Sequence, residues 1–219
     1  MINLAAQNSN GILADDMGLG KTIQAIAYMA YLKEEQGIRG KHLVICPKSV
    51  VNNWVKETRK WLPCSRVEPI RHCKDEREQF FNRVLKPRKF DILVGTYESA
   101  RFLYNSLTRI KWEVLVVDEA HKIKNYESQN FAALSDYYAE FKLLLTGTPL
   151  SNNLLELWTL LTFIMPDVFD DGSLFDMIQE SVDEFEGSEE EKFEYQKKIA
   201  STFHGIIHPF FKRRTKKEL

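Results

Sequence analysis

Residues 11–22 read GILADDMGLGKT, and a stretch with helical spacing of apolar residues follows over residues 21–33. Residues 15–22 (DDMGLGKT) approach the phosphate-loop pattern GxxxxGK[ST], with Asp15 in the place of the first glycine. Glycines let backbone N–H groups curl around phosphate oxygens, and the start of the following helix adds its positive end. The expected phosphate-binding residues are Asp15, Asp16, Met17, Gly18, Leu19, Gly20, Lys21 and Thr22.

Two residues of this loop have specific expected roles. Lys21 would reach the β- and γ-phosphates of a bound nucleotide, and Thr22 would hold Mg²⁺. The alternative is a glycine-rich turn that only caps the next helix, because no clear strand precedes the loop apart from residues 11–14.

A second motif, DEAH at residues 118–121, comes directly after the apolar run VLVV. A carboxylate at the tip of a buried strand can hold Mg²⁺ through Asp118, while Glu119 orients and deprotonates the attacking water. His121 is placed to sense the γ-phosphate or to contact the next motif. An acidic helix start is the alternative, because Asp and Glu favour the first turn of a helix. The GKT motif upstream favours the catalytic interpretation.

A third motif, TGTP at residues 146–149, follows the apolar run KLLL. Its hydroxyls and backbone donors can point towards a nucleotide or a partner motif, although by itself the pattern is only a turn. We expect Thr146, Gly147 and Thr148 to couple the nucleotide site to the rest of the protein.

The chain alternates short apolar runs with helical stretches. Strands are expected at residues 42–46, 90–96, 112–117 and 142–146, with helices at 21–33, 51–61, 76–85 and 128–140. This alternation predicts an α/β fold with a parallel sheet and helices on both faces, in which ligands bind beyond the carboxyl ends of the strands. After residue 149 the pattern is mostly helical, with helices expected at 154–165, 174–185 and 189–207.

Composition excludes several classes of protein. The 219 residues are 44% hydrophobic, which suits a globular domain, and their 30 Lys+Arg against 31 Asp+Glu exclude a uniformly basic nucleic-acid coat. The three cysteines are scattered without a CxxC pair, which argues against a disulfide scaffold. No apolar run reaches the roughly 18 residues of a membrane helix. We therefore expect a soluble intracellular domain with no membrane partner.

The ordered motifs resemble the Swi/Snf-type ATPases of helicase superfamily 2. The similar runs cover nearly the whole chain: GILADDMGLGKTIQAIAYM, LVICPKSVVNNWVKE, ILVGTYE, VLVVDEAHKIKN, LLLTGTPLSNNLLELWTLLTFIMPDVF and PFFKRRTKKEL. The sequence GIRGKHLVICPKS and the spacing after DEAHKIKN are most similar to those of the imitation-switch type of chromatin remodeller. Two positions depart from the family pattern. Asp16 replaces its usual Glu, and Ser151 replaces a Gln whose amide would couple nucleotide to DNA.

The resemblance implies a RecA-like P-loop NTPase lobe that uses ATP and Mg²⁺ for DNA-stimulated hydrolysis. It further implies translocation along duplex DNA, nucleosome sliding and a nuclear location. Lysines, hydroxyls and backbone amides suit contacts to phosphates, which track a strand without reading its sequence. The family's DNA contacts map onto Pro47, Lys48, Ser49, Thr96, Tyr97, Glu98, Lys122 and Lys124. Trp54 is expected in the core rather than on a base-stacking platform, and Lys48 is equally compatible with a solvated loop charge.

By the same resemblance, residues 1–150 form the first ATP-binding lobe, 151–211 its helical extension, and 212–219 a basic linker towards a second RecA-like lobe. That lobe would supply an arginine finger, so the chain alone is expected to turn over little ATP. Two alternatives stay open: a recombination-repair translocase with the same motifs, and a non-enzymatic scaffold that binds nucleotide as a structural ligand. The intact residues Lys21, Thr22, Asp118 and Glu119 favour an enzyme.

Overall fold

The computed structural model describes residues 1–7, 9–70, 79–147, 153–169, 172–185 and 187–218. These residues form a seven-stranded sheet in the order β3-β4-β2-β5-β6-β1-β7, and every neighbouring pair is parallel. The strands are β1 (Gly11–Leu13), β2 (Lys41–Ile45), β3 (Val67–Pro69), β4 (Ile92–Gly95), β5 (Trp112–Asp118), β6 (Ala139–Leu145) and β7 (Phe211–Lys212). The predicted parallel α/β fold is confirmed.

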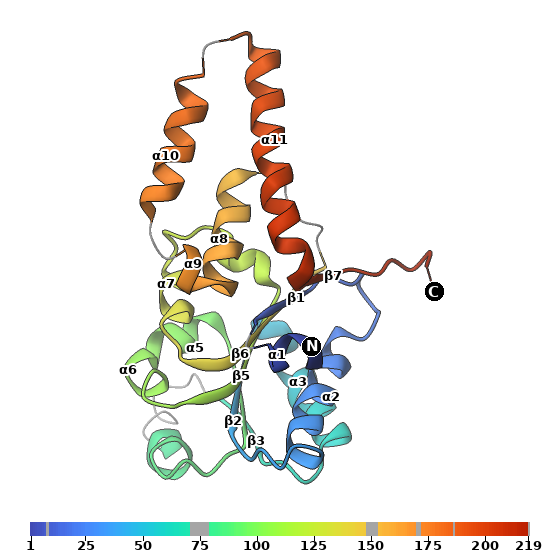
Figure 1. The fold of residues 1–219 in the computed structure, drawn as a ribbon. Helices are drawn as coiled ribbons and strands as arrows, with labels where there is room; N and C mark the ends of the chain where they lie inside the picture. The colour runs from blue at the N-terminus through green and yellow to red at the C-terminus, as the bar shows by residue number, and fades with distance from the viewer. Residues whose placement is uncertain (8, 71–78, 148–152, 170–171, 186, 219) are drawn as a thin grey trace.

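Helices cover both faces of the sheet (Figure 1). One face carries α1 (Ile2–Ala6), α2 (Lys21–Glu34) and α3 (Val51–Trp61), and the other carries α5 (Tyr97–Phe102), α6 (Tyr104–Leu107), α7 (Gln129–Ser135) and α8 (Leu154–Ile164). Successive strand residues therefore enter opposite cores: in β5, Val116 packs with the α2 side and Val117 with the α8 side. This burial on both faces explains why the strands read as unbroken apolar runs.

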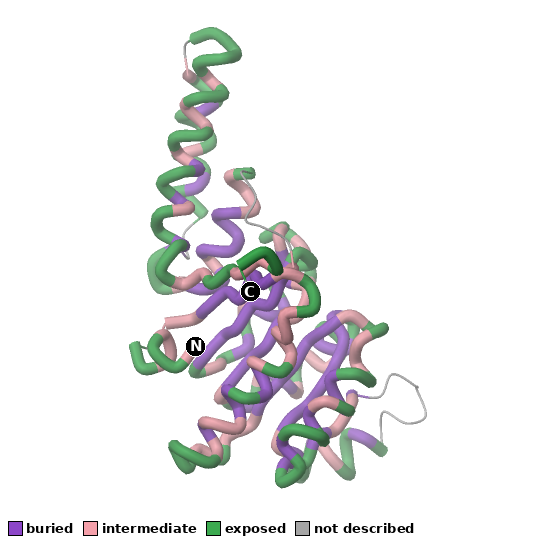
Figure 2. The backbone as a smooth tube through the Cα atoms, turned by 90° about the vertical axis from the view of Figure 1, so that its right-hand side faces the viewer, coloured by how far each residue is buried: buried purple, intermediate pink, exposed green. Residues whose placement is uncertain are grey.

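A helical projection follows the sheet region. It consists of α10 (Gly172–Asp183) and α11 (Glu189–Ile207), reached through the short α9 (Pro166–Phe169), and it extends well beyond the sheet (Figure 1). Its outer part is largely exposed (Figure 2), whereas its base packs on Trp158 through Phe175 and Phe203, at ring-centroid distances of 5.4 and 6.1 Å. Within the described ranges, no helix is both long enough and apolar enough to cross a bilayer.

One predicted helix is wrong in its extent. The helix expected over residues 128–140 ends at Ser135, and β6 begins at Ala139, where it pairs with Trp112 of β5. Tyr137 is buried between the two elements, and its hydroxyl donates to the carbonyl oxygen of Ala100 at 2.7 Å. Pairing with the central strand thus overrides the local helical pattern.

The remaining expected elements appear with small shifts at their ends. The helices expected at 51–61 and 189–207 have the predicted bounds, as α3 and α11. The helix expected at 76–85 lies partly outside the described residues, and its last part, Phe81–Leu85, is a short π-helix. The short strands β3 and β7 were not expected, because such strands carry little periodicity, whereas β1 lies within residues 11–14, the run noted before the phosphate loop.

The buried His42 of β2 makes stability depend on pH. His42 is 4% exposed, its Nδ1 has no hydrogen-bond partner within the described part of the chain, and burial lowers its pKa to about 4. The unfolded chain takes up this proton near pH 6.5, so folding stability falls as the pH drops from 6.5 towards 4, by at most about 3 kcal/mol. Between pH 6.5 and 5, we expect the free energy of unfolding of His42→Leu to fall by about 2 kcal/mol less than that of the wild type. Parallel profiles for the two proteins would contradict this prediction.

Candidate functional site

The three predicted chemical motifs emerge from three adjacent strands. Leu13 of β1, Leu145 of β6 and Asp118 of β5 stand in one row across the sheet. The phosphate loop, the TGT turn and the DEAH motif follow these residues, so all three start at the same level of the carboxyl edge. This is the edge at which parallel α/β sheets bind ligands.

The phosphate loop has the backbone conformation that its glycines permit. Gly18 and Gly20 have φ angles of +90° and +75°, and Gly20 precedes the first residue of α2. The Nζ atom of Lys21 donates to the carbonyl oxygens of Asp15 at 2.6 Å and Asp16 at 3.3 Å. The ammonium group is therefore held by the loop's own oxygens, which phosphate oxygens of a nucleotide could replace.

Thr146 and Gly147, the described part of the TGT motif, adjoin this loop. A Cβ atom on Gly147 would stand 3.1 Å from Met17 Cγ and 3.9 Å from Lys21 Nζ. Thr146 is buried, and its backbone N–H donates to the Leu13 carbonyl oxygen at 3.1 Å. Thr148 lies outside the described residues. The two described residues of the turn thus adjoin the predicted phosphate site.

The Asp118 carboxylate is anchored at the tip of β5. Its Oδ2 accepts a 2.8 Å hydrogen bond from the indole Nε1 of Trp54, and its Oδ1 accepts one of 3.0 Å from the Glu119 backbone N–H. Burial raises the pKa of Asp118, while the Trp54 hydrogen bond and the charge of Lys21 act in the opposite direction. Counting only partners among the described residues, each oxygen keeps one acceptor site, because a carboxylate has about four lone pairs. Carboxylate oxygens are ligands that Mg²⁺ prefers, so Asp118 suits the predicted metal site, and Thr22, the second residue of α2, stays a predicted ligand.

Glu119 occupies a strained backbone position beside Asp118. Its φ of 57° and ψ of 55° place a non-glycine residue in the left-handed region, at a cost of about 1–3 kcal/mol. The Tyr97 hydroxyl holds this turn by donating to the carbonyl oxygens of Asp118 at 2.6 Å and Glu119 at 3.2 Å. The Glu119 carboxylate stays partly exposed and lies 3.2 Å from the Nδ1 atom of His121. The turn therefore presents the carboxylate at the edge of the sheet.

Trp54 is a core residue that also orients Asp118. Trp54→Phe removes the indole donor that orients the Asp118 carboxylate, so we expect ATP hydrolysis by the full-length protein to require about tenfold more Mg²⁺. Trp61→Phe is the matched control, because Trp61 is an exposed tryptophan on the same helix that donates to Glu57. Equal Mg²⁺ requirements in the two variants would contradict the role of Trp54.

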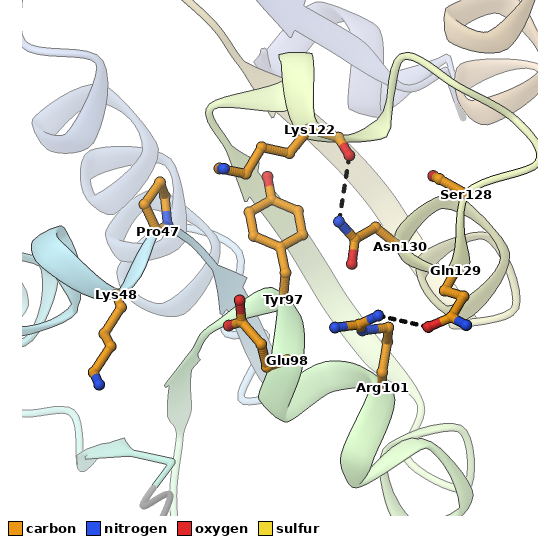
Figure 3. A pocket seen from close by; sticks show the side chains of 9 residues that line it. All are labelled: Pro47, Lys48, Tyr97, Glu98, Arg101, Lys122, Ser128, Gln129 and Asn130. Atoms are coloured by element: carbon orange, nitrogen blue, oxygen red, sulfur yellow. Dashed lines mark hydrogen bonds between the residues drawn. The ribbon is translucent and has the colours of Figure 1, made fainter.

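A basic cavity of about 340 Å³ lies next to the DEAH turn (Figure 3). Ile45, Gly95 and Val117 form one row across β4, β2 and β5, so the segments after these strands meet at this cavity. The lining residues are Pro47, Lys48, Tyr97, Glu98, Arg101, Lys122, Ser128, Gln129 and Asn130. The cavity thus brings together Pro47, Lys48, Tyr97, Glu98 and Lys122 from the predicted DNA contacts. Three of the lining side chains are cations and one is a carboxylate.

The other predicted DNA contacts do not line this cavity. Ser49 follows Lys48 in a short 3₁₀ turn (Lys48–Val50). Thr96 is buried, and its side chain caps α5 by accepting from the Ser99 N–H at 3.2 Å. Lys124 forms an ion pair of 2.7 Å with Glu156 of α8. Thr96 and Lys124 therefore contribute to the fold, and their contact with DNA stays a prediction.

Sequence reasoning missed several cavity residues. Arg101 lies one helical turn after Tyr97 on α5, so the spacing from GTYE contained a signal for it. Its Nη1 donates to Gln129 Oε1 at 2.6 Å, while Asn130 Nδ2 donates to the Lys122 carbonyl oxygen at 3.4 Å (Figure 3). The contributions of α7 had no signal in the sequence, because they depend on how α5 and α7 pack.

Comparison with known proteins agrees with this arrangement. A sequence profile described as the SNF2-related domain matches residues 1–219. The chain belongs to the SNF2-related domain family. This confirms the resemblance to Swi/Snf-type ATPases.

Two yeast relatives match this SNF2-related chain over its whole length. The ISWI chromatin-remodeling complex ATPase ISW2 of Saccharomyces cerevisiae is 39% identical over 219 residues, which are 100% of this chain and 19% of the relative. The ISWI chromatin-remodeling complex ATPase ISW1 of the same organism is 40% identical with the same coverage. The chain therefore spans about a fifth of the length of these relatives.

A solved structure shares the fold. The Sulfolobus solfataricus SWI2/SNF2 ATPase core in complex with dsDNA superimposes with a TM-score of 0.76 at 31% identity. The match covers 98% of this chain and 42% of that chain. The parallel sheet described above is thus the fold of a SWI2/SNF2 ATPase core.

Proposed function

We propose that this SNF2-related chain is the first ATP-binding lobe of a DNA-dependent ATPase that translocates on duplex DNA and remodels nucleosomes in the nucleus. The observation that carries the proposal is the meeting of the phosphate loop, the TGT turn and the DEAH turn at one edge of the sheet, directly beside a basic cavity. The relatives are named as chromatin-remodeling ATPases, which supports the choice of reaction and of nuclear substrate.

In the proposed reaction the phosphate loop receives ATP. Lys21 exchanges the carbonyl oxygens of Asp15 and Asp16 for phosphate oxygens, and Thr22 and Asp118 hold Mg²⁺. When bound, Mg²⁺ neutralises charge on the β- and γ-phosphates. The remaining loop residues, Asp15 to Gly20, surround the phosphates.

Glu119 is the proposed base. Its carboxylate orients a water molecule towards the γ-phosphate and accepts the proton of that water. The contact between Glu119 Oε2 and His121 Nδ1 keeps the carboxylate oriented at the turn. Thr146, Gly147 and Thr148 are proposed to transmit the state of this site, because the described part of their turn lies against Met17 and Lys21.

The proposed DNA contact runs through the basic cavity. Pro47, Lys48 and Ser49, Thr96 to Glu98, and Lys122 and Lys124 would contact backbone phosphates of duplex DNA. Such contacts are independent of sequence, as a translocating motor requires. The complex of the Sulfolobus core with dsDNA supports this choice of partner.

Full activity is proposed to need a second RecA-like lobe of the same polypeptide, because an arginine finger typically contributes about 10³–10⁵ in rate. The experiment is therefore ATP hydrolysis by the full-length protein with and without duplex DNA, beside residues 1–219 alone. We expect strong stimulation by DNA in the full-length protein and nucleotide binding with little turnover in the isolated chain. Absence of stimulation with nucleotide still bound would instead support the scaffold alternative.

A further inference from the structure

The basic segment after β7 lies along the phosphate loop, although the two are about 200 residues apart in the chain. The backbone N–H of Ala14 donates to the Lys212 carbonyl oxygen at 2.8 Å, and that of Asp16 donates to the Arg214 carbonyl oxygen at 3.0 Å. Lys216 adds a bond of 3.2 Å from its backbone N–H to Asp16 Oδ2. The parallel pairing of β1 with β7 thus continues into the loop itself.

Arg214 forms an ion pair and several hydrogen bonds with the side chain of Asp15. Its Nε stands 3.1 Å from each carboxylate oxygen, its Nη2 pairs with Oδ2, and its backbone N–H donates to Oδ1 at 2.9 Å. Gln24 of α2 completes the cluster, since its Nε2 donates to Asp15 Oδ2 at 3.2 Å and its Oε1 accepts from Arg214 at 2.5 Å. Asp15 itself is fully buried.

The ion pair between Arg214 and Asp15 neutralises a buried negative charge at the phosphate site. Burial by itself would raise the pKa of Asp15, but hydrogen bonds from Arg214 and Gln24 lower it below its usual value, so the carboxyl is ionised. Asp15 stands where the phosphate-loop pattern has glycine, and a buried negative charge there would oppose the phosphates of ATP. The guanidinium of Arg214 compensates that charge.

We infer that Arg214 is a positioning residue for the phosphate loop: by holding Asp15, it sets the loop backbone on which Lys21 rests and offsets the negative charge beside the phosphates. Asp15 connects Arg214 to Lys21, because its carboxylate binds Arg214 and its carbonyl oxygen accepts a hydrogen bond from Lys21 Nζ. The inference rests on the proposed function, in which this loop binds ATP.

The test compares Arg214→Ala, Arg214→Lys and the control Lys217→Ala in the full-length protein. Lys217 is an exposed cation three residues further along the same segment. Two quantities are measured: the Kd for ATP, and the acetylation rate of Lys21 without nucleotide, by mass spectrometry with Lys33 as internal reference. The second reports on the loop directly and does not require ATP to bind.

We expect Arg214→Ala to weaken ATP binding by about tenfold or more and to speed acetylation of Lys21, because an uncompensated buried charge disorders the loop. For Arg214→Lys, both the Kd for ATP and the acetylation rate of Lys21 should lie between those of the wild type and Arg214→Ala. Lysine keeps the positive charge but lacks the planar guanidinium that binds both carboxylate oxygens. Lys217→Ala should match the wild type. Adding Asp15→Asn to Arg214→Ala should restore part of the ATP affinity by removing the buried charge, which a purely structural role would not produce.

The inference is overturned if Arg214→Ala binds ATP within about twofold of the wild type and Lys21 is acetylated at an unchanged rate. Failure of the wild type to bind ATP would contradict the proposed function instead. In that case the acetylation rates still decide whether Arg214 positions the loop.

Discussion

We expect Glu119→Gln to leave ATP bound and to lower its hydrolysis by about 10²–10⁴-fold. The amide keeps the shape of the side chain, and the strained turn is held through backbone carbonyls by Tyr97, so the geometry of the site is retained. What the variant loses is the carboxylate that we propose accepts the proton of the attacking water. The measurement is steady-state ATP turnover in the full-length protein with saturating duplex DNA, together with the Kd for ATP.

Glu127→Gln is the matched control for this experiment. Glu127 is an exposed carboxylate in the segment after the DEAH turn, and the same chemical change there should leave turnover at the wild-type rate. Wild-type turnover by Glu119→Gln would show that another group is the base. A loss of ATP affinity as large as the loss of turnover would assign Glu119 to binding.

We expect removal of the three cations of the cavity to lower the affinity for duplex DNA by about 10²-fold near physiological salt. The variant is Lys48→Ala, Arg101→Ala and Lys122→Ala combined, all on side chains that line the cavity in Figure 3. Because each lost phosphate contact reduces counterion release, the slope of log K against log salt should fall by about three. Fluorescence anisotropy with two unrelated duplexes at several salt concentrations measures both quantities.

The control removes an equal charge from the opposite edge of the sheet. Lys86, Lys89 and Arg109 are exposed cations that precede β4 and β5 and therefore lie towards the amino ends of the strands. Their combined substitution by Ala should leave the salt slope nearly unchanged. If both triple variants weaken DNA binding equally, the effect comes from net charge and the cavity is not the DNA site. If the loss differs between the two duplexes, the contacts read sequence and do not only follow phosphates.

Local structure was predictable from the sequence wherever one short segment carries a whole motif. The loop DDMGLGKT contains its own glycines, lysine and helix start, and DEAH contains its own strand tip and carboxylates. The strands were predictable because burial on both faces demands unbroken apolar runs. The helix predicted over 128–140 extends too far, because Ala139 and Glu140 belong to β6, which pairs with β5.

The sequence by itself therefore determined the fold class and the family, and it located the contiguous motifs whose nucleotide roles stay predictions. Only the tertiary structure decided which distant groups complete them: Trp54 bonds Asp118 across 64 residues, Gln129 meets Arg101 across 28, and Arg214 holds Asp15 across 199. The physical reason is that periodicity and short motifs report local conformation and burial. Strand order and the pairing of buried polar groups depend on how separate elements pack, and no local pattern encodes that packing.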